Sequence, residues 1–470
     1  MSKRIKISEL ENQIGNEVKV AGFIHGRRDH GKLIFLDLRD ESGRVQMVAL
    51  PNHSEAHEAA SELRSEWVVE ITGQVNKRPE KMVKADELNG NLELEITAIS
   101  VLNQSKTPPF AVDADSANID EAVRLKYRYL DLRTDRMQKN IRRRSDFVRY
   151  CRDYLYANDF VEIETPLLTE STPEGSRDFV VPSRLQPGKF YALPQSPQQY
   201  KQLLMAGGFE RYFQLARAIR DEDLRADRGF EHTQIDLEMS FVNQEDVLQT
   251  VEEMITTAVE KMGLIIKEKP FPRLTYAESM AKYGADKFDL RTKEDKEAGI
   301  LAYAWVIDFP FFEKTDNGKW TFTHNPFSMP KTEHLDWLLK GENIEKILTT
   351  QYDLVCNGFE SAGGSIRAHR PEILAATYKV MGYSEEETAE RIGHMLEAFS
   401  FGVPPHGGIA VGVDRSLMNL TGATELREVQ AFPMTRGGGT AVMKAPKELT
   451  AEQLAELHLQ IKSPKQNKNN

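Results

Sequence analysis

The sequence predicts an α+β multidomain protein, with a small N-terminal β-barrel followed by a larger domain of mixed strands and helices. Three observations predict this fold class. Short apolar runs separated by glycine and charged turns fill residues 18 to about 104. A Pro-containing segment, SKTPPF at 105–110, then interrupts the pattern. From there to about residue 445, strand-like and helix-like runs alternate.

Composition and charge narrow the class of protein. The chain has 470 residues, of which 40% are hydrophobic and 28% are charged, as in ordinary globular proteins. No apolar run is long enough to span a bilayer, and MSKRIKISELENQIG lacks the apolar core of a signal peptide. The two cysteines, Cys151 and Cys356, lie far apart, which fits a reducing cytoplasm. A net charge of −11 argues against nonspecific coating of nucleic acid, although a local RNA-binding patch remains compatible with it.

Five short strands and one helix, at residues 53–64, predict a barrel of the OB type. In KLIFLDLRD the apolar residues alternate, which leaves Phe35 on the outer face. The same alternation places Gln46 outside on the next strand, close to Arg28. An exposed ring beside an amide and an arginine suits unstacked single-stranded bases. A ring covered by a neighbouring loop explains the pattern equally well.

The larger domain opens with a basic connector and a helix. Residues 105–140 predict a linker, and Ser145 predicts a helix N-cap because apolar residues recur at helical spacing after it. EDVLQTVEEMITTAVEKMG predicts the best-formed helix, with an apolar face that includes Val247 and Val259 and a stop at Gly263. Residues 446–470 predict a C-terminal helix and a disordered tail.

FQLARAIRDEDLRADRGFEHTQ, residues 213–234, predicts a strand–loop–strand hairpin whose loop carries opposed charges. Arg220 stands at the first rim and Arg228 near the returning strand. Planar guanidinium groups match phosphate oxygens bidentately, and carboxylates such as Asp221 and Glu222 would orient them before a ligand binds. A salt-bridged surface hairpin is the competing interpretation, which the residue types alone favour.

Two later segments strengthen a nucleotide-binding interpretation. DLVCNGFESAGGSIRAH carries Asp353 and Glu360, hard oxygen ligands suited to Mg²⁺ beside phosphates, and then adjacent glycines and Arg367. PPHGGIAVGVDRSLMNLTG ends a small-residue strand at Gly412 and opens a helix with Arg415. A positive charge there opposes the helix dipole, so a nearby anion would explain it. A structural ion pair explains either segment equally well.

Three segments in order resemble the signature motifs of class II aminoacyl-tRNA synthetases: VEIETPLL with Pro166, the RDEDLRADRGFEHTQID loop, and the GVDR strand–helix. TPEGSRDF, QSPQQYKQLLM, THNPFS, NGFESAGGSIR and AFPMT resemble the bacterial type of aspartyl-tRNA synthetase. The resemblance implies an OB-fold anticodon-binding domain at 1–104, a hinge at 105–140 and a class II antiparallel-sheet catalytic domain at 141–445. It also implies ATP-dependent activation of L-aspartate with Mg²⁺, transfer to the 3′ end of tRNA(Asp), and a homodimer.

The resemblance assigns roles to individual residues. For ATP the expected residues are Arg220, Asp221, Glu222, Arg228, Gly229, His232, Glu360, Gly412, Val413, Asp414 and Arg415. For aspartate they are Glu174, Ser196, Gln198, Lys201, Arg220, Asp236, His324 and Arg367. For Mg²⁺ they are Asp353 and Glu360, and for the tRNA anticodon they are Arg28, His30, Phe35 and Gln46. Arg220 is the expected catalytic residue, through its grip on the α-phosphate.

Within the aspartate set, the resemblance implies that Arg367 and Lys201 bind the side-chain carboxylate and that Asp236 orders them. Glu174, Ser196 and Gln198 would serve the α-ammonium end.

Several positions depart from the family pattern. The large inserted domain of bacterial members is reduced to a short loop near 290–303. Gly229 stands where a Gln touching ATP is usual, and His232 replaces a Phe that stacks on adenine. His30 occupies a position that varies with tRNA choice, so tRNA(Asn) is a second expected acceptor. The alternatives are a catalytically weak synthetase-like RNA-binding protein and an asparaginyl- or lysyl-type synthetase.

Overall fold

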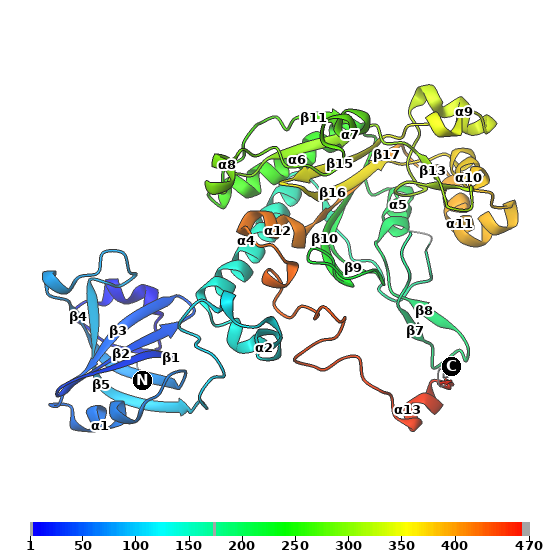
Figure 1. Cartoon of the computed structure of the whole chain (residues 1–470). Helices are drawn as coiled ribbons and strands as arrows, with labels where there is room; N and C mark the ends of the chain where they lie inside the picture. The colour runs from blue at the N-terminus through cyan, green and yellow to red at the C-terminus, as the bar shows by residue number, and fades with distance from the viewer. Residues whose placement is uncertain (1–2, 173–174, 463–470) are drawn as a thin grey trace, which may run out of the picture. The chain divides into compact units, whose positions relative to one another are not determined.

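The computed structural model describes residues 3–172 and 175–462 and divides the chain into two compact units (Figure 1). One unit comprises Met1–Arg124 with Tyr129–Asp135, and the other comprises Leu125–Arg128 with Arg136–Asn470. Glu174 and most of the predicted disordered tail lie outside the described residues. Among the helices of the described ranges, none combines the length and the apolar character that a membrane crossing requires.

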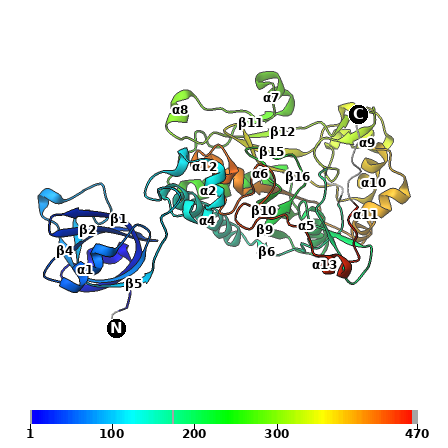
Figure 2. The same cartoon turned by 60° about the horizontal axis from the view of Figure 1, so that its bottom comes forward.

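The first unit contains a closed five-stranded barrel, seen as a ring of strands in Figure 2. Its strands pair in the order β1-β2-β3-β5-β4, and all neighbours are antiparallel except β3 and β5. The elements are β1 (Glu17–His30), β2 (Leu33–Asp40), β3 (Gly43–Ala49), α1 (Ser54–Glu62), β4 (Val68–Lys77) and β5 (Leu92–Asn103). Every second residue of β2 up to Leu38 is buried in the barrel core, as the alternation predicts.

The second unit is built on an eight-stranded sheet in the order β11-β12-β15-β16-β17-β10-β9-β6. Neighbours are antiparallel except at the two edges, where β11 pairs with β12 and β6 with β9 in parallel. The strands are β6 (Val161–Glu162), β9 (Arg211–Ile219), β10 (Glu231–Ser240), β11 (Arg273–Thr275), β12 (Tyr303–Ile307), β15 (Gln351–Cys356), β16 (Phe359–Ile366) and β17 (His406–Gly412).

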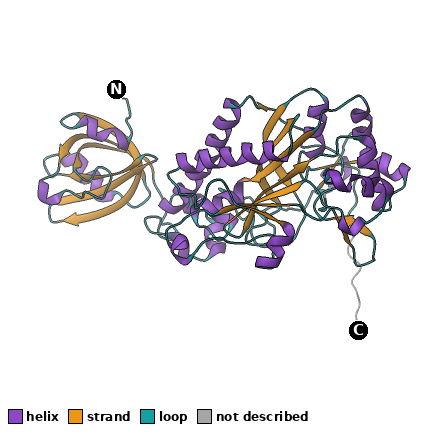
Figure 3. Cartoon of the chain, turned by 90° about the horizontal axis from the view of Figure 1, so that it is seen from above, coloured by secondary structure: helices purple, strands orange, loops and turns teal. Residues whose placement is uncertain are grey.

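Three helices cover one face of this sheet: α4 (Asp135–Ala157), α6 (Gln244–Lys261) and α12 (Val413–Thr421). Figure 3 shows purple helices flanking the orange strands of the sheet. Apolar residues of the three helices share one core with Ile235, Leu237 and Val411 of the sheet. The predicted apolar face of α6 is buried. Gly263 follows the C-cap residue of this helix with a left-handed φ of 71°, as the predicted stop requires.

The opposite face of β10 and β17 carries a different chemistry. Gln234, Asp236 and Glu238 alternate with the core residues of β10, so all three project from the other face. Their partners on β17 are Gly412, Ala410 and Gly408, which leave space above the sheet. Because side chains repeat every second residue, one face is apolar core and the other is available for polar groups.

The remaining elements lie outside the sheet and its three covering helices. Helices α9 (Leu335–Lys340), α10 (Pro371–Val380) and α11 (Glu385–Ser400) form a second apolar cluster. Helix α5 (Gln198–Ala206) contacts β10, and α7 (Tyr276–Tyr283) contacts β11. Further elements are α8 (Lys293–Glu297) and two small strand pairs, β7 (Val180–Pro182) with β8 (Phe190–Ala192) and β13 (Phe312–Lys314) with β14 (Trp320–Phe322). The others are α2 (Glu121–Lys126), α3 (Arg128–Asp131) and α13 (Ala451–Glu456).

The predicted N-cap at Ser145 is wrong, because α4 begins ten residues earlier, at Asp135. The basic stretch before Ser145 is helical because tertiary partners satisfy its polar groups. Arg143 donates to the carbonyl of Leu420, and Arg144 donates to Asp414 at 2.6 Å. These partners lie more than 250 positions away in the sequence, so local periodicity did not reveal them.

Candidate active site

A cleft of about 670 Å³ lies at the hairpin between β9 and β10 and is also lined by residues of β16 and β17. The hairpin has the predicted strand–loop–strand form, with residues 220–230 between the strands. We call this cleft the arginine cleft because Arg220, Arg228 and Arg415 line it. The other predicted ATP residues that line it are Asp221, Glu222, Gly229, His232, Glu360, Gly412 and Asp414.

The arginines of the cleft are held by loose, half-exposed contacts. Arg220 donates from Nε to the carbonyl of Gln195 at 3.1 Å and lies 4.0 Å from Glu222. Arg228 pairs with the same Glu222 at 3.2 Å. One carboxylate therefore lies between two guanidinium groups, as expected of a loop that keeps its arginines oriented before an anion binds.

Arg415 pairs with Asp227 at 3.2 Å and lies 3.7 Å from Glu360. Among the described residues, its neighbour Asp414 is not one of its ion-pair partners. Asp414 is buried and accepts instead from Arg144 and from the backbone N–H of Thr233, so it fastens α12 to α4 and β10. Asp414 also lines the arginine cleft, so its role as an ATP contact stays a prediction beside this structural role.

The predicted ATP contact of Val413 also stays a prediction, and the structure limits it to the backbone. The side chain of Val413 is fully buried and belongs to the core cluster beneath the sheet. Only its backbone is left to approach a nucleotide, because the strand-to-helix turn at Gly412 directs the side chain into the apolar core.

His232, at the start of β10, lines the cleft as a neutral ring. Burial, assisted by the charge of Arg220, lowers the pKa of His232 to about 3. Next to it, a Cβ atom built on Gly229 would meet no atom closer than 3.7 Å. The hairpin therefore has room for a side chain at 229, and glycine there is not imposed by packing.

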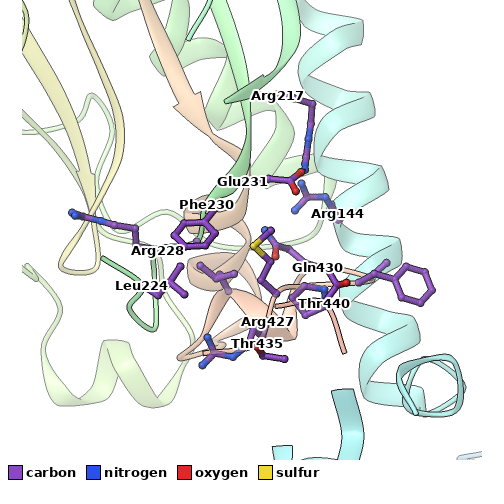
Figure 4. Close-up of a pocket in the computed structure, with 16 residues that line it drawn as sticks. Arg144, Arg217, Leu224, Arg228, Phe230, Glu231, Arg427, Gln430, Thr435 and Thr440 are labelled. Atoms are coloured by element: carbon purple, nitrogen blue, oxygen red, sulfur yellow. The ribbon is translucent and has the colours of Figure 1, made fainter. Parts of the chain in front are cut away.

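A second, smaller hollow of about 200 Å³ adjoins the arginine cleft and shares Arg228, Gly229 and Leu426 with it. Figure 4 shows Arg217, Glu231 and Arg144 grouped at one end of this hollow and Arg228 pointing away at the other. Arg217 donates to Glu231 across the hairpin strands. The segment 430–435, including AFPMT, forms much of the remaining wall.

Four charged side chains form a buried charge cluster farther along the same sheet face: Lys201, Asp236, Glu238 and Arg367. Lys201 donates to Asp236 at 2.8 Å and lies 3.2 Å from Glu238. Arg367 places a bidentate fork on Glu238, with distances of 2.8 and 3.1 Å. Asp236 thus contacts Lys201, whereas the carboxylate partner of Arg367 is Glu238. Arg367 does not line the arginine cleft.

The cluster already pairs its cations before any ligand arrives. Arg367 also donates to Ser365 and to the carbonyl of Gly408, so four of its donor contacts are in place. Two cations and two carboxylates therefore lie together, and their four formal charges sum to zero. Oδ1 of Asp236 is buried without a hydrogen-bond partner among the described residues, which leaves one acceptor for a ligand.

Burial and pairing shift the pKa values of the two carboxylates in opposite directions. Burial raises the pKa of Asp236, against the pull of Lys201. For Glu238, burial also disfavours the charged form, but Arg367 and Lys201 outweigh it and lower its pKa to about 2. Glu238 therefore stays charged as the fixed partner of Arg367.

A third group of polar residues lies at the β15–β16 edge of the arginine cleft. Glu360 pairs with Lys287 at 2.8 Å. Asp286, His324 and Asp353 place one ligand atom each within 4.8 Å of one another. Burial, and then the charge of Glu360, raises the pKa of Asp353 well above its ordinary value. Oδ2 of Asp353 has no hydrogen-bond partner among the described residues.

These features fit a divalent cation. The charge of Glu360 raises the pKa of Asp353 even though Lys287 pairs with Glu360, and an unpartnered buried carboxylate oxygen is a ready ligand. The donor set of Asp353 and Glu360, with Asp286 and His324 beside it, therefore suits Mg²⁺.

The remaining predicted aspartate residues lie at the start of α5. Ser196 accepts a hydrogen bond from the backbone N–H of Gln198 at 3.2 Å. Gln198 donates in turn to Gln202 at 3.0 Å. His324 lies elsewhere, with its ring edge-on to Phe309 at 4.9 Å and its pKa lowered by burial.

The four predicted anticodon residues share one outer face of the barrel. Arg28 on β1 pairs with Phe35 of β2 in the strand register, and the ring of His30 lies edge-on to Phe35 at 5.8 Å. Arg28 also contacts Gln46 on β3 at 3.4 Å. The partly buried ring of Phe35 thus lies beside Arg28 and His30, and its role in reading unstacked bases stays a prediction.

Sequence reasoning missed Glu238, Lys287 and Asp286. Glu238 had a usable signal, because it follows Asp236 by two positions and therefore shares its strand face. Lys287 and Asp286 had none, since their partners are brought to them from the THNPFS segment and from β15 and β16.

Comparisons with known proteins agree with this architecture. Residues 120–436 match the family model described as tRNA synthetases class II (D, K and N), and residues 18–102 match an OB-fold nucleic acid binding domain. An aspartate–tRNA(Asp/Asn) ligase from Rubrobacter xylanophilus is 40% identical, with 98% of this chain and 97% of the relative aligned. An aspartate–tRNA ligase from Staphylococcus saprophyticus is 37% identical, with coverage of 98% and 100%.

The R. xylanophilus alignment extends over 584 positions, whereas 98% of this 470-residue chain is about 460 residues. About 120 aligned positions therefore have no counterpart here, as a missing inserted domain would produce. In the region predicted to have lost it, Thr292 caps the five-residue helix α8.

Solved structures share the fold. An aspartyl-tRNA synthetase from Entamoeba histolytica superimposes with a TM-score of 0.72 at 22% identity, over 92% of this chain and 91% of that one. An asparaginyl-tRNA synthetase from Pyrococcus horikoshii gives 0.73 at 21% identity, over 93% and 99%. With its OB-fold barrel, its eight-stranded sheet and its arginine cleft, the chain belongs to the class II aminoacyl-tRNA synthetases, in the group that the family model designates D, K and N.

Proposed function

We propose that this protein activates L-aspartate with ATP to aspartyl-adenylate and transfers the aspartyl group to the 3′ end of tRNA(Asp). The observation that carries the proposal is the pair of sites on one sheet face. The arginine cleft at Gln234 and Gly412 suits a polyphosphate. The buried charge cluster begins on the same strand face of β10 with the next two residues that point that way, Asp236 and Glu238. The names of the relatives from R. xylanophilus and S. saprophyticus support aspartate as the amino acid.

The first half-reaction needs positioning more than a protein nucleophile. An oxygen of the α-carboxylate forms a bond to the α-phosphorus, the bond from that phosphorus to the bridging oxygen breaks, and pyrophosphate leaves. Negative charge grows on the phosphoryl oxygens, so a fixed guanidinium such as Arg220 lowers the barrier. No general base is required, because the attacking carboxylate is already ionised.

The arginines of the cleft divide the nucleotide among them in this proposal. Arg220 binds the α-phosphate, Arg228 the distal phosphates, and Arg415 lies against adenine and the γ-phosphate. Their present partners, Glu222 and Asp227, are half-buried carboxylates that the phosphates replace on binding. The neutral ring of His232 stacks on adenine without adding charge.

Asp353 and Glu360 would hold Mg²⁺ with the nucleotide. When bound, the ion neutralises phosphate charge as a Lewis acid. Lys287, now 2.8 Å from Glu360, must then give up this partner.

The buried charge cluster receives the amino acid. Arg367 retains one N–H group beyond its four present contacts, and Lys201 retains donors beyond Asp236. A side-chain carboxylate fits these donors, whereas the amide of asparagine would set its own NH₂ against them. Selection in this proposal therefore rests on donor geometry, with Glu238 fixing the guanidinium plane.

Aspartate-dependent ATP–pyrophosphate exchange tests the proposal. We expect exchange with aspartate, and a kcat/KM at least 10³-fold lower with asparagine or lysine, since a site built for one polar group rejects its analogue strongly. Exchange with none of the three would favour a synthetase-like RNA-binding protein, an alternative that Gly229 and His232 motivate. Exchange with asparagine alone would reassign the substrate.

We further propose that tRNA(Asn) is a second acceptor. The position of His30 against Phe35 at the expected anticodon face supports this, as does the Asp/Asn name of the R. xylanophilus relative. Charging purified tRNA(Asp) and tRNA(Asn) side by side tests it. Comparable kcat/KM values are expected, and a tRNA(Asn) value more than about 10³-fold lower, the scale of strong discrimination, contradicts it.

A homodimer completes the proposal. Tyr156 at the end of α4 and Val161, Leu167 and Leu168 around Pro166 are each about half exposed. Apolar side chains gathered on one surface in this way favour burial against a second copy. Sedimentation equilibrium should give twice the monomer mass of 53.5 kDa. A monomer at micromolar concentration contradicts it.

A further inference from the structure

A buried hydrogen-bonded chain runs from β17 to the first turn of α5. Nδ1 of His406 lies 2.8 Å from the carbonyl oxygen of Pro404, and its Nε2 lies 3.1 Å from Nε2 of Gln202. Oε1 of Gln202 accepts from Nε2 of Gln198 at 3.0 Å. His406 and Gln202 are both fully buried, so water does not compete for these contacts.

Hydrogen-bond chemistry fixes the direction of this chain. The carbonyl of Pro404 only accepts, so Nδ1 of His406 carries the proton. In a neutral imidazole the other nitrogen is then an acceptor, and it faces the NH₂ group of Gln202. Oε1 of Gln202 is left for the NH₂ group of Gln198. Turning Gln202 over would oppose two acceptors at one end and two donors at the other.

The neutral form of His406 is the one that its surroundings favour. Burial lowers the pKa of His406 to about 4, because the ring is enclosed and the charged form loses its hydration. The ring of Phe399 lies edge-on to it at 6.0 Å.

We propose that His406 is a positioning residue for the α-ammonium group of the bound amino acid. Through Gln202 it holds Gln198 with its NH₂ group occupied and its Oε1 available. Within the described part of the chain, Oε1 of Gln198 accepts no hydrogen bond, and an ammonium group brings only donors. The inference rests on the proposed function, in which Gln198 serves the ammonium end of aspartate.

A double-mutant cycle tests whether His406 acts through Gln198. His406→Leu removes the terminal acceptor, and Gln198→Met removes the oxygen that it orients. Each single variant should raise the KM for aspartate in pyrophosphate exchange about 10-fold, the value of one hydrogen bond to a charged group. The KM for ATP should change less than about 2-fold, and the double variant should be no worse than about 2-fold beyond Gln198→Met.

Conservative and matched variants separate positioning from folding. His406→Gln places an amide oxygen near the position of Nε2 and should recover most of the loss. Gln202→Met breaks the chain at its centre and should reproduce the effect of His406→Leu. His394→Leu is the matched control. His394 lies on α11 and contacts Gln199 of α5 at 2.5 Å, but it takes no part in the hydrogen-bonded chain from His406 to Gln198.

Two results would overturn the inference. One is a double variant in which the two single effects multiply, so that its KM for aspartate is about 100-fold above that of the wild type. The two residues would then act independently. The other is an equal rise in the KM for ATP together with a lowered melting temperature, which marks a general packing role. Failure of the proposed function is distinct, since wild-type protein would then show no aspartate-dependent exchange.

Discussion

The two sites on the polar sheet face hold their charges in opposite ways. In the buried charge cluster, every side chain is at most 2% exposed and has an oppositely charged partner within the cluster. In the arginine cleft, the three arginine side chains are 24–36% exposed and pair with carboxylates at 3.2–4.0 Å. Breaking a buried pair costs several kcal/mol, whereas an exposed pair contributes about 1 kcal/mol or less. The cluster is therefore preformed, and the cleft exchanges its partners easily.

This difference suits the two ligands. A small amino acid must be told apart from a near-isostere, so its site gains from donors that do not move. A polyphosphate brings its own strong negative charge and needs arginines that release Glu222 and Asp227 without a large penalty.

Removing Glu238 should have the largest effect. Glu238→Gln leaves Lys201 and Arg367 buried with a single carboxylate, so the free energy of unfolding should fall by about 3–5 kcal/mol and aspartate-dependent exchange should be lost. Urea unfolding followed by circular dichroism measures the first quantity. Glu222→Gln is the control from the arginine cleft and should change the unfolding free energy by less than about 1 kcal/mol. Equal losses in both variants would remove the contrast between the sites.

Arg220→Gln should act on rate and leave stability nearly unchanged. Its side chain is 32% exposed, so the expected change in unfolding free energy is below about 1 kcal/mol. Exchange kcat should fall about 10²–10³-fold, because Arg220 faces charge that grows in the transition state. Steady-state pyrophosphate exchange measures this. A raised KM with unchanged kcat would assign Arg220 to ground-state binding alone.

The free energy of unfolding should depend on pH through the buried side chain of His406. Burial lowers its pKa to about 4, below an unfolded value of about 6.5. The unfolded state therefore binds a proton that the folded state does not, and the unfolding free energy falls as pH drops below 6.5. Between pH 7 and 5 this group removes about 2 kcal/mol from the wild type but not from His406→Gln. Urea unfolding of both proteins at pH 7 and pH 5 measures this change. If the ring is already charged in the folded state, the wild type and His406→Gln should lose the same unfolding free energy.

Lys287→Met tests whether Lys287 competes with Mg²⁺ for Glu360 at the edge of the arginine cleft. Lys287 competes with a cation for Glu360, and a partly exposed pair is worth about 1 kcal/mol. The Mg²⁺ concentration at half-maximal exchange should therefore fall about 5-fold. Lys296→Met is the matched control, because Lys296 pairs with Asp289 at 3.2 Å, away from Glu360. An equal shift in both variants would point to general electrostatics.

His232→Phe should have the smallest effect. A larger apolar ring on adenine gains about 0.5 kcal/mol, so the KM for ATP should fall about 2-fold. Initial rates at varied ATP measure it, with the KM for aspartate as the internal control. An unchanged KM for ATP would mean that the ring at 232 does not stack.

Periodicity and motif order were sufficient for much of the fold. The alternation in β2 predicted the barrel face that carries Phe35, and the spacing in α6 predicted the face that is buried. The hairpin between β9 and β10 followed from an apolar–charged–apolar pattern. Each of these features is local, because its signal and its structure lie within about 20 residues.

The start of α4 and the pairing of charges were not predictable in this way. The arginines of α4 that precede Ser145 donate to Leu420 and Asp414, which are distant in the sequence. Nothing near Val413 in the sequence distinguishes a core side chain from a nucleotide contact.

The sequence by itself determined which chemical groups are present and which face of each strand they occupy, because side-chain direction follows backbone periodicity. Only the tertiary structure decided which charges neutralise one another. Glu238 and Arg367 are 129 residues apart, yet their bidentate pair decides how many donors are left for an amino acid. Coulomb energy depends on distance and burial, and the folded chain alone sets both.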